Sequence, residues 1–579
     1  MICQNLSSSM RERTNLWTRN TENGCTMART IPIGEQSFTE LRQNTLFYVD
    51  KTKFIQEWWN SHDKVTLITR PRRFGKTLLL DTVKTFFSTE FAGQSPLFEG
   101  LTIWQDEAFR RLQGTIPVIA LSFADCKSTT YETTRQLINE KLEILFDDFD
   151  ALLDHSLFSD RDAARFARVQ KSMDKSTAQT AVQNLSRFLV RQHYAKPIIL
   201  LDEYDTPLHE AHLHGFWDKL AAYLRGFFNA TFKTNPYLGR ALITGITLFA
   251  KNSPLADLNM DIVTTTSKRY ADCFGFTEQE VFSAMDEYGL TDKEAVKQWY
   301  DGFIFGRTKE IYNPWSITKY LETKDLAPYW AQSGSNALLS DLIKNGGLGV
   351  QEEMARLLQG KSITLSMDEQ IDFSLLSTHS RAIWSLLMAA GYVKALRVDP
   401  ATEEYTLTLT NQEVHFILKN LISDWFTIDY YANTGTFCKA LLADDIPRMN
   451  AILNRITHNT CSFFTKNPEP ERFYHAFVLG LIVDLTARYE IRSNRESGEG
   501  RYDVCLFPKQ SSDRGIGIEF KTRKADEEND LHETCENALT QIAEKHSANE
   551  LKAWNCASIF TYGFAFDGKK VLICGGATQ

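Results

Sequence analysis

Four short apolar runs rich in β-branched residues mark the first half of the chain, and stretches with helical spacing separate them. The runs are Val65–Thr69, Val118–Phe123, Ile198–Leu201 and Ala241–Ile246. Before the third run, apolar residues recur every three or four positions, which predicts an amphipathic helix. Strands that alternate with helices are typical of a parallel sheet covered by helices. The pattern therefore predicts an α/β fold for residues 27–255.

The pattern changes after residue 255. Residues 256–370 mix aromatic side chains with turn signals and helical stretches, which predicts a helical lid or subdomain. Residues 371–466 contain an apolar helix, a stop at Gly391, two short strands and another helix. This order predicts a winged-helix-like connector, with an ordinary linker domain as the alternative. Pro468 and Pro470 mark a boundary, and the strands and helices beyond it predict a smaller α/β domain at residues 467–579.

Composition narrows the class of protein. The 579 residues include 64 Lys and Arg against 73 Asp and Glu, for a net charge of -9. A cationic nucleic-acid coat is excluded, so any contact with nucleic acid requires a local basic surface. The chain is long enough for several compact units, and its 43% hydrophobic content is typical of folded enzymes.

Three features predict an intracellular protein, cytoplasmic or nuclear. The ten cysteines form no C-x-x-C pair and have no regular spacing to histidine, so reduced core thiols are expected rather than a zinc site or a disulfide framework. No apolar run is long enough to cross a bilayer, so no membrane partner is expected. Residues 1–26 are polar and predict a disordered leader; their Ser and Arg content would suit a transit peptide, but Glu12 and Glu22 argue against one.

A glycine-lysine-threonine turn follows the first apolar run and precedes a predicted helix, which is the context of a P-loop. Backbone amides in such a loop cradle phosphates, Lys76 reaches the β and γ oxygens, and the Thr77 hydroxyl binds Mg²⁺. The first glycine of the usual motif is replaced by Arg70, so a chance match in a basic turn is the alternative. The residues expected to bind ATP are Arg70, Pro71, Arg72, Arg73, Phe74, Gly75, Lys76 and Thr77.

A fully apolar run that ends in Asp202 and Glu203 supplies the second half of this site. Such a strand belongs in the middle of a parallel sheet. Asp202 is expected to hold Mg²⁺, and Glu203 to act as the base on the attacking water. A core strand followed by a solvated acidic turn is the alternative.

A further strand between the two motifs indicates the additional-strand class of P-loop NTPases. Thr244 ends the next strand, where that class places a polar sensor of the γ-phosphate. The alternative, equally compatible with the sequence, is that Thr244 is an ordinary β-strand threonine at a turn.

A second set of charged residues lies near the C-terminus. Glu519 and Lys521 share one face of a predicted strand because side chains repeat every two positions. With Asp503 on a neighbouring strand, the two carboxylates would bind Mg²⁺ while Lys521 activates water beside a phosphodiester. Restriction-type nucleases use this arrangement of two carboxylates and a lysine. The alternative interpretation is that Glu519 and Lys521 lie on an ordinary exposed strand face. Many such enzymes have one more carboxylate on a helix. No such residue is evident here, and Glu490 or Glu496 would take its place.

Short motifs spread over nearly everything after Met27 carry a family resemblance. They are Ile31-Pro32-Ile33-Gly34, Tyr48-Val49-Asp50-Lys51-Thr52, the segment from Thr69 to Thr77, Leu201-Asp202-Glu203-Tyr204-Asp205-Thr206-Pro207-Leu208, Phe274-Gly275-Phe276-Thr277, Trp299-Tyr300-Asp301-Gly302, Tyr312-Asn313-Pro314-Trp315-Ser316, Ser493-Asn494-Arg495-Glu496-Ser497-Gly498 and Glu519-Phe520-Lys521. On these motifs the chain resembles AAA-ATPase-like proteins fused to a C-terminal PD-(D/E)XK nuclease-like domain. The resemblance implies ATP, Mg²⁺ and a restriction-endonuclease-like C-terminal fold, and it implies that Arg70 in place of glycine is usual.

One departure from the family affects catalysis. After Ile246 the family tends to carry a basic residue, whereas this chain continues with Thr247. If an arginine there serves the γ-phosphate, hydrolysis would be slow unless Arg240 or Arg269 replaces it, or unless a homo-oligomer supplies one in trans.

Two classes of function follow. The first is an ATP-dependent, Mg²⁺-dependent nuclease that acts on DNA ahead of RNA. The second is a nucleotide-switched regulatory protein whose nuclease-like domain binds nucleic acid without cutting it. The complete set of acidic and lysine residues favours the first class, and the missing helical carboxylate favours the second.

Overall fold

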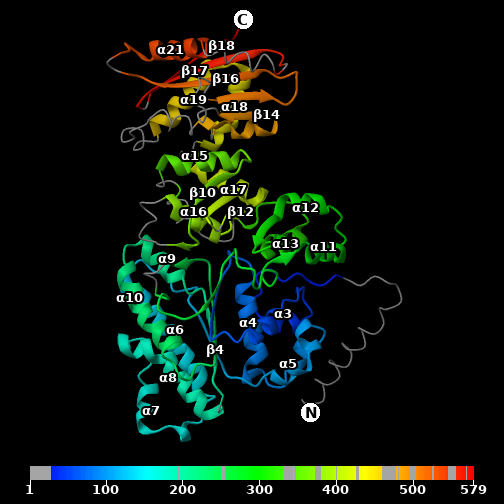
Figure 1. The fold of residues 1–579 in the computed structure, drawn as a ribbon, viewed down its shortest axis with the longest axis vertical. Coiled ribbons are helices and arrows are strands. Elements are labelled where there is room, and N and C mark those ends of the chain that lie inside the picture. The colour runs from blue at the N-terminus through cyan, green and yellow to red at the C-terminus, as the bar shows by residue number, and fades with distance from the viewer. Residues whose placement is uncertain are drawn as a thin grey trace, which may run out of the picture.

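The computed structural model describes residues 28–578, apart from residues 194, 250–253, 331–342, 344–346, 372–379, 400, 425–429, 460–477, 480, 494–503, 525–526, 545–553, 555 and 569. Along the long axis, an α/β core unit lies at one end and a C-terminal unit at the other, with a connector between them (Figure 1). The predicted leader lies outside the described residues. Within them, no helix combines the length and the apolar character that a bilayer crossing needs.

The core unit is built on a five-stranded parallel sheet in the order β2-β3-β4-β1-β6. Its strands are β1 (Val65–Thr69), β2 (Val118–Ser122), β3 (Ile198–Asp202), β4 (Arg240–Gly245) and β6 (Asp261–Val263). The predicted parallel sheet is therefore confirmed. Because β4 lies between β1 and β3, the ends of all three strands meet at one edge.

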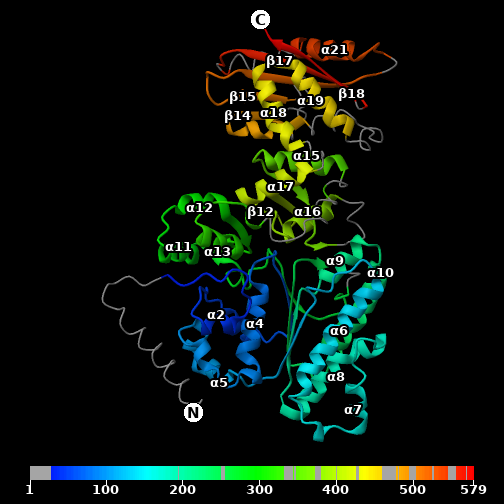
Figure 2. The ribbon, with the colours of Figure 1, turned by 180° about the vertical axis from the view of Figure 1, so that it is seen from behind.

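Helices cover both faces of this sheet (Figures 1 and 2). Alternate side chains of one strand point to opposite faces, so Leu67 packs into one cluster and Ile68 into the other. The Ile68 face is covered by α2 (Phe38–Gln43), α3 (Lys53–Asn60), α4 (Lys76–Phe87) and α5 (Glu107–Leu112). The Leu67 face is covered by α6 (Tyr131–Asp150), α8 (Lys175–His193), α9 (Thr206–Leu213) and α10 (Trp217–Phe228), with α7 (Asp160–Phe166) beside α8.

The predicted helical lid at residues 256–370 is only partly helical. Its first strand, β6, completes the core sheet. The lid proper contains a small antiparallel sheet in the order β7-β9-β8. Its elements are β7 (Phe276–Thr277), α11 (Glu278–Glu287), α12 (Lys293–Tyr300), β8 (Asp301–Phe305), β9 (Thr308–Tyr312) and α13 (Pro314–Thr323).

The connector contains the predicted helix, hairpin and helix, but it begins upstream of residue 371. Helix α15 and strand β10 pack against the predicted elements, and β10 joins the hairpin in a sheet of order β10-β13-β12. The winged-helix-like interpretation stays a prediction. The elements are α15 (Gly347–Leu358), β10 (Ile363–Ser366), α16 (Ser380–Ala389), β12 (Val393–Asp399), β13 (Glu404–Leu409) and α17 (Gln412–Asp424).

The connector and the core unit share one hydrophobic cluster. It includes Phe249 of the core unit and Trp384 and Leu387 of the connector. A short parallel pair of strands, β5 (Leu248–Phe249) and β11 (Gln370–Ile371), also joins the two. The connector is therefore packed on the edge of the core unit that follows β4.

The C-terminal unit contains a five-stranded mixed sheet in sequential order, and only β16 and β17 run parallel. Its strands are β14 (Tyr489–Ser493), β15 (Val504–Pro508), β16 (Gly515–Thr522), β17 (Ile559–Asp567) and β18 (Lys570–Ala577). Helix α21 (Leu531–Glu544) packs on β16, β17 and β18.

Two helices upstream of the predicted start of this unit at residue 467 pack on its sheet, and the boundary itself stays a prediction. Helices α18 (Tyr430–Ala443) and α19 (Ile446–Asn459) bury apolar residues such as Leu441 and Leu453 in the same cluster as Phe564 of the sheet. Sequence reasoning assigned these helices to the connector because Pro468 and Pro470 signal a break; both prolines lie outside the described residues.

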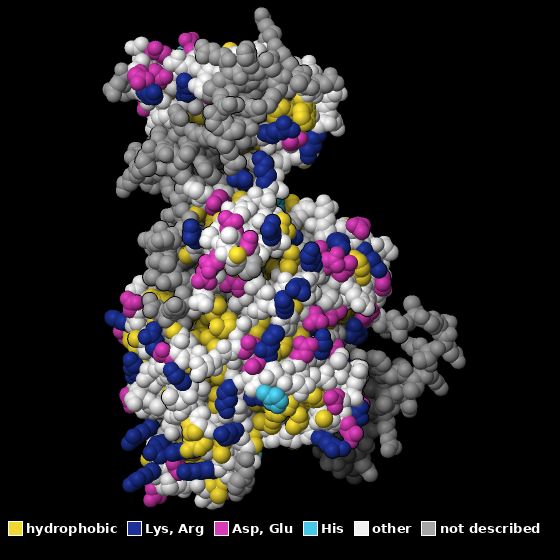
Figure 3. Space-filling model, in the orientation of Figure 1, with side chains coloured by type: hydrophobic (Ala, Val, Ile, Leu, Met, Phe, Trp, Pro, Cys, Tyr) yellow, Lys and Arg dark blue, Asp and Glu magenta, His cyan; other side chains and the backbone are white. Residues whose placement is uncertain are grey.

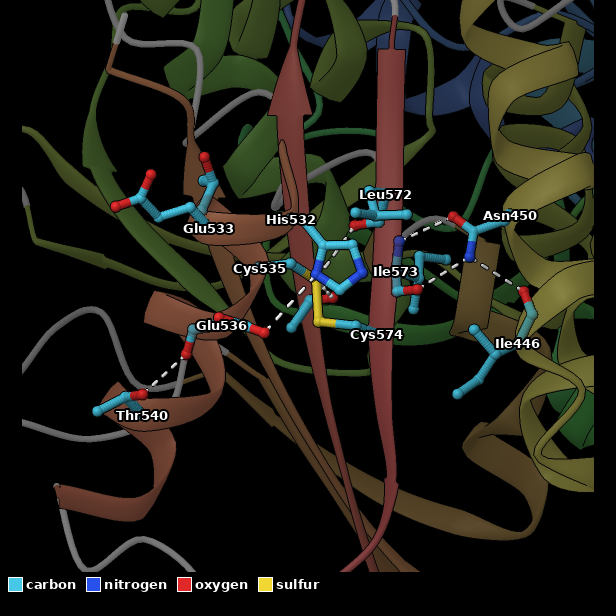
Figure 4. The surroundings of a disulfide bond; sticks show 12 residues. Ile446, Asn450, His532, Glu533, Cys535, Glu536, Thr540, Leu572, Ile573 and Cys574 are labelled. Atoms are coloured by element: carbon cyan, nitrogen blue, oxygen red, sulfur yellow. Dashed lines mark hydrogen bonds and ion pairs between the residues drawn. A yellow bond between two sulfur atoms is a disulfide. The ribbon is translucent and has the colours of Figure 1, made fainter. Parts of the chain in front are cut away.

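Hydrogen bonds on one side and a disulfide on the other hold the edge strand β18. Asn450 of α19 donates to Ile573 O at 2.9 Å and accepts from Ile573 N at 2.8 Å (Figure 4), and Asn454 makes the same pair of bonds with Val571. On the other side, a disulfide joins Cys535 of α21 to Cys574. The expectation of reduced thiols throughout is wrong for this pair, because two cysteines 39 residues apart meet only through the tertiary fold.

Candidate functional site

The loop after β1 begins the first candidate site. Gly75, with φ of 78°, turns the chain into α4, so the first amides of the helix face the loop. The buried Lys76 donates from Nζ to Arg70 O at 3.0 Å and to Pro71 O at 2.8 Å. Burial lowers the pKa of this ammonium. The loop therefore surrounds a lysine that is positioned to exchange carbonyl partners for phosphate oxygens.

Three strand ends meet at Asp202. Its Oδ2 accepts a hydrogen bond from the Thr77 hydroxyl at 2.6 Å, and its Oδ1 accepts one from the Thr244 hydroxyl at 2.5 Å. Only 5% of Asp202 is exposed. The predicted ligands Thr77 and Asp202 are thus in contact, and they fit Mg²⁺ because a hydroxyl and a carboxylate oxygen are the donors it prefers.

Glu203 follows Asp202 in a strained conformation, with φ of 51°. The strain turns its carboxylate into the cavity described below, where the Thr206 hydroxyl donates to it at 2.9 Å. A left-handed glutamate at a strand end is uncommon.

The next acid, Asp205, ties this strand end to the chain after β4. It is 1% exposed and accepts hydrogen bonds from the amides of Ile246 and Thr247 and from the Thr247 hydroxyl, each at 2.8 Å. Tyr204 adds a bond from its hydroxyl to Thr247 O at 2.7 Å. The segment that leads from Thr244 to β5 is therefore held by residues adjacent to Glu203.

A cavity of about 470 Å³ opens in front of these residues. Its lining includes the loop from Arg72 to Thr77, together with Glu203, His209 and Lys127. Part of its wall is apolar and aromatic, and comes from segments distant in sequence. These wall residues are Pro32, Ile33, Val49, Phe276, Pro314 and Trp315.

These wall residues lie in the motifs that carry the family resemblance, but the sequence predicted no role for them. The available signal was the presence of apolar and aromatic residues inside turn-rich motifs. Two lid contacts bring them to the loop: the Arg73 guanidinium lies 4.4 Å from the Trp315 ring centroid, and Asn313 Nδ2 donates to Arg72 O at 3.3 Å.

The side chain of Arg70 is not among those that line the cavity, and its role in binding the cofactor stays a prediction. It is fully buried, lies 4.5 Å from the Phe305 centroid and donates to Thr264 O at 2.7 Å. Burial lowers its pKa to about 10. The arginine therefore anchors the lid under the loop, which is a contact that a glycine could not make.

Neither proposed substitute for the missing basic residue reaches this site. Arg240 is the first residue of β4 and stacks on Trp59, with 4.4 Å to the ring centroid. Arg269 pairs with Asp63 and Asp261, both at 2.6 Å. These groups lie where the parallel strands begin, whereas Asp202 and Thr244 lie where they end.

Only part of the second candidate site lies within the described residues. Glu519 and Lys521 lie two residues apart on β16, as predicted, and Glu519 is 2% exposed. Asp503 and Glu496 lie outside the described residues. Glu490 pairs with Arg492 at 2.8 Å on β14 and faces Phe507, which places it two strands away from Glu519 and about 13 Å further along the strand direction. Within the described part of the chain, no three metal-binding side chains cluster.

A local basic surface lies far from this second site. Lys and Arg side chains gather over α7 and α8, at the end of the molecule opposite the C-terminal unit (Figure 3). The buried Asp162 holds two of them, Arg187 at 2.6 Å and Arg191 at 2.5 Å. The molecule therefore has the kind of local basic surface that an acidic chain needs to contact phosphates.

Comparison with known proteins matches two parts of the chain. Residues 32–254 match the family described as Predicted AAA-ATPase, and residues 469–575 match the PD-(D/E)XK nuclease superfamily. Over 502 residues the chain is 25% identical to the Azotobacter chroococcum mcd 1 protein named "Uncharacterized protein in vnfD 5'region", with 82% of this chain and 87% of that protein covered. Both matched parts contain candidate site residues.

Proposed function

We propose that this chain, which carries an AAA-ATPase-like domain at residues 32–254 and a PD-(D/E)XK nuclease superfamily domain at residues 469–575, couples ATP hydrolysis to cleavage of nucleic acid. The contact of Thr77, which lines the cavity, and of Thr244 with the two oxygens of Asp202 carries the ATPase part of the proposal. The position of β4 between β1 and β3 supports the additional-strand class.

Each residue of the nucleotide site has a distinct task in this proposal. Lys76 leaves its two carbonyl partners and binds the β and γ oxygens. Thr77 and Asp202 hold Mg²⁺, which supplies positive charge between the phosphates. Glu203 accepts a proton from the attacking water, and Thr244 keeps Asp202 oriented. The aromatic wall that includes Phe276 and Trp315 receives the base.

The C-terminal domain supplies the cutting site. Asp503 and Glu519 hold Mg²⁺, Lys521 stabilises charge at the scissile phosphate, and Glu496 is the candidate additional acid. Restriction-type chemistry favours DNA ahead of RNA as the substrate. Nucleotide state reaches this domain through the connector, because Asp205 holds the segment that continues into β5, and β5 pairs with β11.

The proposal is tested with purified protein and Mg²⁺ on circular and linear DNA and RNA, with and without ATP. ATP hydrolysis that rises with nucleic acid, together with cleavage that requires the same metal, is expected. Absence of ATP hydrolysis under every condition would refute the ATPase part.

A second candidate is a nucleotide-switched protein that binds nucleic acid without cutting it. The absence of three clustered metal-binding side chains among the described residues favours this candidate. Binding of nucleic acid that depends on ATP, without cleavage in Mg²⁺ or Mn²⁺, would favour it over the first.

A further inference from the structure

Charge is unevenly distributed along this acidic chain. Residues 159–196 carry eight Lys and Arg against three Asp and Glu, a net charge of +5, whereas the whole chain has a net charge of -9. Figure 3 shows Lys and Arg side chains gathered over the helices of this segment. Its exposed cations lie on α7, on α8 and between the two helices. We call them the α7–α8 surface: Arg161, Arg165, Arg168, Lys171, Lys175 and Arg191.

A buried carboxylate arranges part of this surface. Asp162 is 2% exposed and pairs with Arg187 at 2.6 Å and Arg191 at 2.5 Å. Arg165 lies 3.5 Å from the same carboxylate. One negative charge thus holds three guanidinium groups from two helices, which leaves positive charge in excess. Because a guanidinium has five N–H donors, Arg165 and Arg191, with side chains 47% and 45% exposed, keep donors for a ligand.

Most of the other cations of the surface are not neutralised within the described part of the chain. There, Arg161, Arg168 and Lys175 form no ion pair. Lys171 pairs with Glu140 of α6 at 2.7 Å. Helix α6 has six Asp and Glu against two Lys and Arg, so charges of opposite sign lie on different helices instead of alternating along one face.

The C-terminal unit has no comparable positive excess. Residues 469–575 carry 14 Lys and Arg against 18 Asp and Glu, a net charge of -4. Net charge therefore gives this domain no attraction for a polyanion, although its superfamily acts on nucleic acid. Affinity for nucleic acid comes largely from Lys and Arg that neutralise phosphates. Another part of the chain has to supply these cations, and the α7–α8 surface has them.

The surface fits a phosphate backbone better than it fits unpaired bases. Single-stranded nucleic acid is commonly held by aromatic rings on which the bases stack. Among the described residues of segment 159–196, no aromatic ring is exposed, because Phe188 is buried and Phe166 is half-buried beside it. Guanidinium groups instead match pairs of phosphate oxygens, and such contacts carry no information on base sequence.

We propose that the α7–α8 surface binds the phosphate backbone of a nucleic-acid duplex, irrespective of its base sequence, and supplies most of the chain's affinity for nucleic acid. This contact lies at the opposite end of the molecule from the C-terminal unit (Figure 1). The inference rests on the proposed function for the choice of nucleic acid as the partner.

A triple variant tests the surface with little risk to its fold. Arg161→Gln, Arg168→Gln and Lys175→Gln are combined in the full chain, because these three exposed side chains form no ion pair with the described residues. The bonds of Asp162 to its arginines stay in place. The variant should therefore have the thermal unfolding curve of the unaltered chain.

The matched control removes the same charge elsewhere. It combines Arg307→Gln and Lys309→Gln in the lid with Arg397→Gln in the connector, so it too loses two exposed arginines and one exposed lysine. Both variants then have the same net charge. Any difference between them in binding comes from where the charges lie.

Fluorescence anisotropy with labelled duplexes, in EDTA to prevent cleavage and at several KCl concentrations, measures the effect. The Kd of the α7–α8 variant should rise at least about tenfold, and that of the control should rise less than about threefold. The slope of log K against log salt should become shallower by about two to three in the α7–α8 variant, because fewer counterions are released. Two duplexes of unrelated sequence should lose affinity equally.

Several results would overturn the inference. They are equal losses in the two variants, unchanged affinity in the α7–α8 variant, no duplex binding by the unaltered chain, and tighter binding of a single strand than of the duplex. Light scattering tests a second copy of the chain as the occupant. An oligomer that only the α7–α8 variant disrupts would make this surface a contact between copies, with the acidic α6 as its complement.

Failure of the inference can be told apart from failure of the proposed function, because the binding measurement needs neither ATP turnover nor cleavage. An unaltered chain that binds duplex through this surface but shows neither activity would refute the proposed function and support the inference. An active chain whose duplex affinity survives the three substitutions would refute the inference alone.

Discussion

The Thr77 hydroxyl donates a hydrogen bond to Asp202 at 2.6 Å although 125 residues separate the two in the chain. The bond exists because α4 begins, and β3 ends, at the same edge of the parallel sheet. Thr244 occupies the other carboxylate oxygen. The two hydroxyls therefore fix the orientation of the Asp202 carboxylate at this edge.

Lys76→Ala and Glu203→Gln should separate binding from turnover. Loss of the Lys76 charge removes the main contact to the β and γ oxygens and should abolish tight ATP binding. Glu203→Gln should leave binding intact and remove turnover, because an amide cannot accept the proton from water. Isothermal titration with ATP and a phosphate-release assay measure the two effects.

Glu107→Gln, an exposed carboxylate on α5, is the matched control and should behave like the unaltered chain. Equal turnover in Glu203→Gln and the unaltered chain would contradict the assignment of the base.

The core sheet and its phosphate loop could be predicted because their signals are local. A fully apolar strand, a glycine turn and a following helix occupy consecutive residues, and parallel strands bring their ends together without further information. The contact of Thr77 and Thr244 with Asp202 follows from this arrangement.

The buried contacts of the Arg70 side chain could not be predicted, for the opposite reason. Its burial between Phe305 and the Thr264 carbonyl depends on a lid that lies 190 or more residues further along the chain. The packing of α18 and α19 on the C-terminal sheet could not be predicted for the same reason, since these helices have the same helical periodicity whichever sheet they cover. Local patterns identify elements, but tertiary contacts decide to which unit an element belongs.

Gly391→Ala should impair ATP turnover without removing any nucleotide contact. Gly391 has φ of 87°, and an added Cβ would lie 2.8 Å from Phe303 and 2.9 Å from Pro71. The substitution therefore pushes on the loop from the connector and should lower kcat as well as stability. Steady-state hydrolysis and urea unfolding measure both.

Gly360→Ala is the matched control, because Gly360 has φ of 77° but no atom within 4 Å of an added Cβ. It should lose only the backbone cost of about 1–2 kcal/mol and keep its kcat. Equal kcat in Gly391→Ala and Gly360→Ala would argue against coupling through Pro71.

A fragment of residues 430–579 should fold, whereas a fragment of residues 469–579 should not. The shorter fragment lacks α19, so it loses the bonds of Asn450 and Asn454 to β18 and leaves an edge strand and an apolar face exposed. Circular dichroism and thermal denaturation of the two purified fragments measure whether each one folds and unfolds cooperatively. Cooperative unfolding of the shorter fragment would show that the upstream helices are dispensable.

Glu413 should make stability depend on pH. This 1% exposed carboxyl accepts from the Ser316 hydroxyl at 2.8 Å and from Trp330 N at 2.6 Å, and burial raises its pKa from 4.5 to about 7. The unfolded chain loses the proton above pH 4.5 while the folded chain keeps it to about pH 7. The free energy of unfolding should therefore fall between these values, by about 2–3 kcal/mol, and level off above pH 7.

Glu413→Gln keeps an acceptor for Trp330 and remains neutral, so it should remove this dependence and be more stable than the unaltered chain at pH 8. Urea unfolding at pH 5, 6, 7 and 8 measures the difference, with Glu404→Gln on the exposed side of β13 as the control. Parallel pH curves for Glu413→Gln and Glu404→Gln would mean that Glu413 is already ionised in the folded chain.

Substitutions of Asp503, Glu519 and Lys521 should impair cleavage in different ways. Glu519→Gln or Asp503→Ala removes a metal ligand, so cleavage should disappear while ATP hydrolysis at the distant loop continues. Lys521→Ala leaves both carboxylates, so Mn²⁺ binding should persist, nucleic-acid affinity should fall only modestly, and the chemical step should be lost. Glu490→Gln, whose carboxylate pairs with Arg492 on β14, should cleave normally. Cleavage by Asp503→Ala at the rate of the unaltered chain in metal-replete buffer would place the activity elsewhere, and the non-cutting, nucleotide-switched candidate would then take precedence.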